Sequence, residues 1–322
     1  ERLYLDAWEA ELRMPAQALE KWRLMAGLYP DDFAGQANTA WHLYEANRFD
    51  EALPYARAAD VPQDPLQVMA ANTLARIQLA RGEAEQALKR LRGIENEAQA
   101  DHKRRVANAL AVLERPAEAT AALDAIEPSG YPGIDFYPLI DRVSLALDQG
   151  QWEQAGVVAE QALEAGRTQD TFSYLQFCFI TEVVGWRAGA RDRKSSHAGT
   201  ARILASAMAA PDWAPSNRED LAVMLLANAW LAQREGDATL AASALSHTEN
   251  LTREGVLGVS LAALRRILQA GQLAGAGRHD EAIALLAPRA DDLYQSRVAL
   301  YHLLAASGRH AEAEVQARWL LQ

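Results

Sequence analysis

Cysteine, long apolar runs and aromatic residues are scarce in this sequence of 322 residues. The single cysteine excludes an internal disulfide framework and a metal site built from several cysteine ligands. That residue, Cys178, lies in the apolar run 177–180, which favours a buried thiol over a reactive one. The longest apolar stretch, Leu221 to Ala232, is interrupted by Asn228 and is shorter than the roughly 18 residues that span a bilayer. We therefore expect no direct membrane insertion by this segment.

Positive charge is also in deficit. The chain has 32 Lys and Arg residues against 43 Asp and Glu residues, a formal net charge of −11. Because phosphate backbones attract positive fields, nucleic acid is not an expected partner. The sequence has no glycine-rich phosphate loop, no nucleophile elbow and no two-histidine helix motif. The acidic residues beside His279 and His310 lie where helix starts are expected, so we predict no metal site, no cofactor and no catalytic residues.

A short pattern recurs along the chain: a small or polar residue, four residues of turn and helix start, and then an alanine. The marker alanines are residues 18, 52, 87, 119, 155, 241, 282 and 313, separated by 34, 35, 32, 36, 86, 41 and 31 positions. The gap of 86 corresponds to two periods with an insertion, and the missing copy falls near Gly189. The residues that open the eight turns are Arg13, Asn47, Gly82, Glu114, Gly150, Gly236, Gly277 and Gly308, and Pro15 occupies the first turn.

This pattern predicts pairs of antiparallel helices. Glycine tolerates the left-handed conformation that ends a helix, and Asp or Glu in the next helix's first turn offsets its positive dipole end. The alanine follows where the two helices cross, because a larger side chain would hold the backbones apart. A spacing near ~34 residues is typical of the tetratricopeptide repeat. We therefore expect an all-α fold, a right-handed superhelical solenoid of about nine such pairs.

We expect one continuous solenoid over residues 1–322. The turn-rich segment near 127–136 and the irregular segment near 187–218 are predicted insertions, either binding loops or hinges. The chain begins with Glu1 rather than Met and stops in the helical-looking segment 318–322, so we interpret it as a fragment of a longer protein.

The candidate binding residues follow from counting back from each turn. In a solenoid of stacked pairs, first helices line the concave face, and residues six and ten positions before the turn should point into it. This count selects polar and aromatic side chains on neighbouring first helices and one aromatic in a later pair, and Tyr44 is added because it lies beside them: Trp41, Tyr44, Asn72, Arg76, Arg104, Asn108 and Trp230. Asn can bond a peptide backbone, Arg can fork onto a carboxylate, and an aromatic ring can anchor a partner. The alternative interpretation is an ordinary solvated face.

Beyond its tetratricopeptide-type repeats, the opening of the chain shows a more specific likeness. Residues 1–4, 18–20, 28–32 and 48–52, with Asn38 and Ala40, resemble the start of C-terminal repeat regions in bacterial multidomain signalling proteins. Such regions follow a serine/threonine kinase domain, a winged-helix DNA-binding domain, or a cyclase-like domain of peptide-modification systems. The resemblance implies a sensory or partner-docking segment whose output domain lies upstream.

We therefore expect a non-catalytic scaffold that binds a protein or peptide segment. Two alternatives stay open: a self-association module that forms a homo-oligomer through the apolar end 319–321, and a small-molecule-sensing regulatory domain. The absence of disulfides is compatible with the cytoplasm or the periplasm, with or without a membrane tether upstream of Glu1.

Overall fold

The computed structural model describes the chain except for residues 14, 95–99, 130–131, 167–170, 188, 190–191, 210–214, 250–258 and 322. Within the described part the fold is all-α, with 18 α-helices, one short 3₁₀-helix and no strand. This confirms the predicted all-α class, whereas the superhelix and the number of helix pairs stay predictions. The packing divides the chain into two compact units, which we call unit 1 (Glu1–Phe177) and unit 2 (Cys178–Gln322), and the boundary falls within helix α11.

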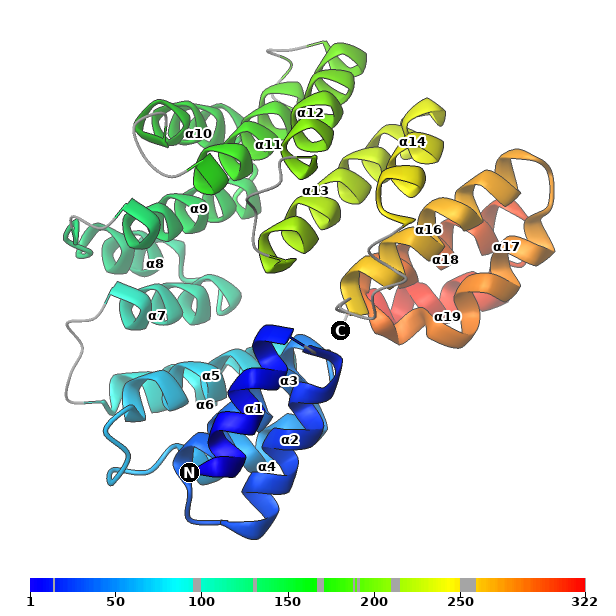
Figure 1. The fold of residues 1–322 in the computed structure, drawn as a ribbon. Coiled ribbons are helices and arrows are strands. Elements are labelled where there is room, and N and C mark those ends of the chain that lie inside the picture. The colour runs from blue at the N-terminus through cyan, green and yellow to red at the C-terminus, as the bar shows by residue number, and fades with distance from the viewer. Residues whose placement is uncertain are drawn as a thin grey trace. The chain divides into compact units, whose positions relative to one another are not determined.

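Unit 1 is a series of helices that follow one another with short connections (Figure 1). Its helices are α1 (Arg2–Arg13), α2 (Pro15–Leu28), α3 (Phe33–Glu45), α4 (Phe49–Ala59), α5 (Gln67–Ala80), α6 (Ala84–Arg92), α7 (Ala100–Val112), α8 (Pro116–Asp124), α9 (Pro132–Asp148) and α10 (Trp152–Gly166). Helix α11 (Thr171–Arg187) crosses the boundary between the units.

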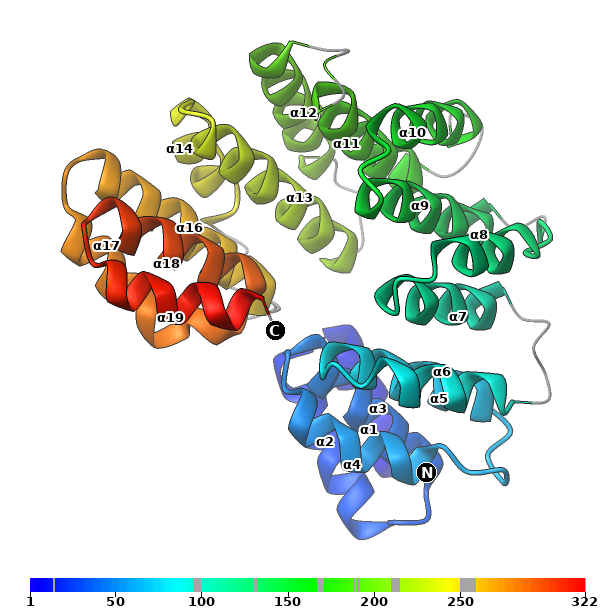
Figure 2. The ribbon, with the colours of Figure 1, turned by 180° about the vertical axis from the view of Figure 1, so that it is seen from behind.

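Unit 2 repeats the same organisation and, seen from behind, shows the same side-by-side packing of successive helices (Figure 2). Its elements are α12 (Arg193–Met208), α13 (Pro215–Arg234), α14 (Thr239–His247), α16 (Val259–Gly275), α17 (His279–Leu286), the 3₁₀-helix η1 (Ala287–Asp292), α18 (Tyr294–Ala306) and α19 (His310–Leu320).

The predicted turns are where the sequence analysis placed them. Eight described residues have a positive φ, and they are Gly189 and seven of the eight turn-opening residues; Arg13, which opens the first turn, is not among them. At Gly82, with φ of +76°, the backbone N–H donates to the Leu79 carbonyl at 3.0 Å, and the N–H of Glu83 donates to the Gln78 carbonyl at 2.8 Å. This hydrogen-bond pair ends a helix while satisfying its last carbonyl groups. The same pair recurs at the other six turn-opening residues with a positive φ.

The marker alanines lie in the packed interior. All eight are buried, and seven of them have no exposed surface. In unit 1, four of them, Ala18, Ala52, Ala87 and Ala119, belong to hydrophobic core clusters, and the cluster of Ala52 includes Leu74 and Ile77 of the next pair. A methyl group at this position lets the two helices of a pair approach closely, which the periodic alanine predicted.

Contacts between helices join near neighbours in the chain. In unit 1, α1 packs on α2, α3 on α4, α5 on α6 and α7 on α8, and each second helix also packs on the next first helix. First helices touch directly as well, because α5 contacts both α3 and α7, and α7 contacts α9. This adjacency brings side chains from three successive pairs onto one surface.

Two segments differ from the sequence analysis. Residues 193–208, predicted to belong to an irregular insertion, form the regular helix α12, and residues 132–136 of the other predicted insertion form the first turns of α9. Residues 130–131 and 210–214 lie outside the described part of the chain. None of the described helices is both long enough and apolar enough to cross a bilayer.

Candidate functional site

Six of the seven predicted binding residues come from three neighbouring first helices of unit 1. Helix α3 carries Trp41 and Tyr44, α5 carries Asn72 and Arg76, and α7 carries Arg104 and Asn108. Because α5 contacts α3 on one side and α7 on the other, these side chains lie on adjoining helices. We call these six residues the first-helix cluster.

Aromatic rings and one guanidinium group form the α3 side of the cluster. The rings of Trp41 and Tyr44 lie 5.7 Å apart between centroids, and Tyr44 also contacts Phe49 at 5.8 Å. The guanidinium carbon of Arg76 lies 5.1 Å from the centre of the Trp41 ring, a cation–π contact. Trp41 and Tyr44 are only partly buried, so this part of the cluster is open to a partner.

Asp101, in the first turn of α7, is the centre of the cluster. Its carboxylate accepts hydrogen bonds from the Asn72 amide at 3.1 Å, from Arg104 at 3.1 Å and from Arg105 at 3.0 Å. The guanidinium of Arg76 approaches the same carboxylate at 3.9 Å. One acidic side chain therefore joins α5 to α7.

The charges around Asp101 lower the pKa of its carboxyl group. Burial alone would raise the pKa of Asp101, but the positive charges of Arg105, Arg76 and Arg104, with the Arg105 hydrogen bond, outweigh burial and hold the pKa below its usual value. Burial also lowers the pKa of Arg105, against the opposing attraction of Asp101. The lowered pKa keeps Asp101 ionised at neutral pH.

Arg104 does not face a partner in the way that the sequence predicted. Its guanidinium donates to both carboxylate oxygens of Asp141 on α9, at 2.5 and 3.3 Å, and stacks 4.8 Å from the ring centre of Tyr137. The side chains of Arg104 and Asp141 are only 11% and 12% exposed. This pair braces α7 against α9, and its donors are already used.

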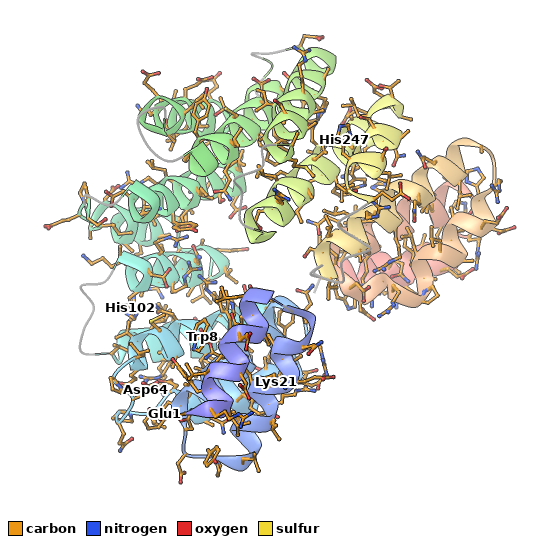
Figure 3. All side chains as sticks on the ribbon, in the orientation of Figure 1. Glu1, Trp8, Lys21, Asp64, His102 and His247 are labelled. Atoms are coloured by element: carbon orange, nitrogen blue, oxygen red, sulfur yellow. The ribbon has the colours of Figure 1, made fainter. Side chains whose placement is uncertain are left out.

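The two asparagines are also engaged internally. Asn72 is buried; its amide nitrogen donates to Asp101, and its oxygen lies 3.2 Å from Nδ1 of His102, a buried side chain on α7 beside the preceding pair (Figure 3). In the amide orientation that satisfies both of its atoms, Asn108 donates to the Arg104 carbonyl at 3.2 Å and accepts from Arg105 at 3.1 Å. Asn72 therefore joins α5 to α7, whereas the hydrogen bonds of Asn108 lie within α7.

The seventh predicted residue, Trp230, lies on α13 in unit 2. The guanidinium of Arg234 stacks 5.2 Å from its ring centre and lies 3.4 Å from the His302 ring. Burial and the nearby charge of Arg234 both lower the pKa of His302. Trp230 therefore belongs to a separate aromatic and cationic group within unit 2.

The sequence analysis did not single out four residues that contact the cluster: Asp101, Arg105, Asp141 and Tyr137. A signal for Asp101 was present, because it precedes Arg104 and Arg105 by three and four residues, the spacing at which side chains meet on a helix. The pairing of Arg104 with Asp141 could not be predicted from local sequence patterns, because the two residues are 37 positions apart.

Within the described residues, no group of three or more His, Cys, Asp or Glu side chains is arranged to hold a metal ion. What the cluster offers is therefore aromatic surface, N–H and O–H donors and paired charges. These groups suit the binding of a polar or acidic segment of another molecule.

Comparison with known proteins gives no family assignment. No protein-family model matches the chain, and no curated protein sequence matches it. A solved structure of Naa15/Naa10 bound to HypK-THB aligns with 99% of this chain and 62% of the matched chain, at 10% identity and a TM-score of 0.24. The chain thus spans less than two thirds of that protein's length, and at this TM-score neither the fold nor the function of the chain rests on the similarity.

Proposed function

We propose that the chain is a non-catalytic binding scaffold whose helix pairs form a tetratricopeptide-type solenoid. Its first helices α3, α5 and α7 hold a peptide segment of another protein against the first-helix cluster. The predicted role in bacterial signalling, as the docking segment of a longer protein, is the biological setting that we propose for this activity.

One observation carries the proposal. Trp41, Tyr44 and Arg76 form a contiguous, partly exposed group, while Asn72, Arg104 and Asn108 on the adjoining helices are held by internal hydrogen bonds. Aromatic and arginine side chains are the residue types that supply most of the binding energy in protein interfaces. Neighbouring side chains that are already fixed lower the entropy that is lost on binding.

The test starts from a displayed library of short random peptides selected on the whole chain. The tightest peptide is then titrated against the wild type and against a Trp41→Ala/Tyr44→Ala variant. We expect the double substitution to weaken binding by at least about 30-fold, because two interface anchors of about 1 kcal/mol or more each are removed. The matched control is Trp152→Ala, which removes another partly exposed ring of unit 1, 38% exposed, at the start of α10. Equal affinity of the wild type and the Trp41/Tyr44 variant would refute the assignment of the face.

A further inference from the structure

The six residues of the first-helix cluster divide into two sets by the use of their hydrogen-bond donors. Three of them donate to internal acceptors: Asn72 to Asp101, Arg104 to Asp141, and Asn108 to the Arg104 backbone carbonyl on α7. The other three, Trp41, Tyr44 and Arg76, donate no hydrogen bond to any residue that the structure describes. The second set therefore presents an indole N–H, a phenol O–H and a guanidinium group that donate no hydrogen bond within the described part of the chain; the only acidic contact of Arg76 there is the 3.9 Å approach to Asp101.

The Trp41 ring positions the guanidinium of Arg76, but no close hydrogen bond within the described residues uses its N–H donors. The Arg76 guanidinium stacks on Trp41, and its approach to Asp101, at 3.9 Å, is longer than the roughly 2.7–3.2 Å of an N–H to O hydrogen bond. Its side chain is 23% exposed, against 11% for Arg104 and 9% for Arg105. A guanidinium fixed by ring stacking loses little freedom when it binds a planar acceptor.

The charges of the cluster leave one positive charge uncompensated. Arg76, Arg104 and Arg105 face two carboxylates, Asp101 and Asp141. Arg104 and Arg105 hold both carboxylates by close hydrogen bonds, so the surplus charge lies on Arg76. This local excess contrasts with the formal net charge of −11 for the whole chain.

We propose that Arg76, with Trp41 and Tyr44 beside it, recognises a carboxylate of the bound segment. The carboxylate takes two parallel N–H bonds from the guanidinium and displaces its long contact with Asp101, which keeps its hydrogen bonds from Arg104, Arg105 and Asn72. One surplus positive charge matches a singly charged carboxylate better than a doubly charged phosphate. The group is an Asp or Glu side chain or the C-terminal carboxylate of the segment.

This inference rests on the proposed function, and the same random peptide library tests it. The library displays its peptides with a free C-terminus. We expect the selected peptides either to be enriched in Asp or Glu or to depend on that terminal carboxylate. The tightest peptide is synthesised in three forms: as selected, with its acidic residue changed to the amide, and with an amidated C-terminus. The form that loses affinity identifies the source of the carboxylate.

Each peptide form is titrated against the wild type, Arg76→Gln, Arg76→Lys and the control Arg57→Gln, an exposed residue on α4. We expect loss of the peptide carboxylate and Arg76→Gln each to lower affinity about tenfold, and the two together no further. Arg76→Lys keeps the positive charge but cannot donate two parallel hydrogen bonds to a carboxylate. Its affinity for the peptide should therefore lie between those of the wild type and Arg76→Gln. The far-UV circular dichroism of each variant confirms folding.

Two results overturn the inference. One is additive losses, which would show that the peptide carboxylate and Arg76 act separately. The other is the selection of peptides that carry no acidic group and that still bind the Trp41→Ala/Tyr44→Ala variant more weakly than they bind the wild type. The second result would leave the binding face in place and remove only its carboxylate specificity. Peptides that bind the Trp41/Tyr44 variant as well as the wild type would instead remove the proposed function.

Discussion

At the scale of single residues, the arginines predicted to bind a partner have different environments. Arg104 is paired with Asp141 and shielded from water, whereas Arg76 keeps exposed N–H donors. The sequence could place both residues on first helices, because helix periodicity is local. It could not divide their roles, because the acidic partner of Arg104 lies on another helix, 37 positions away.

The Arg104–Asp141 pair is expected to be a structural brace. We predict that Asp141→Asn and Arg104→Gln each lower the free energy of unfolding by about 3 kcal/mol, because either change leaves one group of a buried ion pair without its partner. The double substitution should cost less than the sum of the two. Urea unfolding followed by circular dichroism measures these values, and a neutral Asp141→Asn variant would contradict the structural role.

Glu11 on α1 gives the fold a pH-dependent contribution. Burial would raise the pKa of Glu11, but hydrogen bonds from His42, at 3.0 Å, and from Trp22, at 2.7 Å, outweigh it and lower the pKa. A depressed pKa stabilises the folded chain at neutral pH, and this stabilisation is lost as the pH falls through the folded-state pKa.

We therefore predict that Glu11→Gln destabilises the chain at pH 7 and that its difference from the wild type shrinks as the pH falls through the acid range. The measurement is urea unfolding at a series of pH values. Glu20→Gln, at an exposed position on α2, is the control and should show no such trend. A difference that stays constant with pH would show that the Glu11 carboxylate does not stabilise the fold through its charge.

At the scale of elements, turns and helix crossings were predictable, because each is encoded by residues close in sequence. The left-handed residue, the hydrogen bonds around it and the buried alanine five positions later form one local unit. Helix α12 was not predictable in this way, since its segment contains Ser, His, Gly and Thr, which favour helices weakly. It is stabilised by packing on α13, where the His197 ring lies 2.7 Å from the Asn228 oxygen.

The turn at Gly82 permits a direct test of this local encoding. A methyl group added at Gly82 meets no atom within 4 Å, so any cost of Gly82→Ala comes from the backbone φ of +76°. We predict a loss of about 1–2 kcal/mol in stability. Gly27, inside α2, also has open space and no positive φ, so Gly27→Ala should be neutral or stabilising by up to about 1 kcal/mol. Urea unfolding compares the two variants, and equal effects would contradict this account of the turn.

At the scale of the whole molecule, helix contacts join near neighbours along the chain, and two compact units result. In such an array a binding surface is built from equivalent positions on successive pairs, which is how α3, α5 and α7 form the first-helix cluster. The second helices α4 and α6 carry other residues and are not part of this cluster.

Hydrogen–deuterium exchange with and without a library-selected peptide tests the central claim most directly. We predict slower exchange on peptide binding in residues 33–45 and 67–80, which form α3 and α5, and little change in α4 and α6. Protection confined to the second helices, or to unit 2, would contradict the proposal that the first-helix cluster is the binding face.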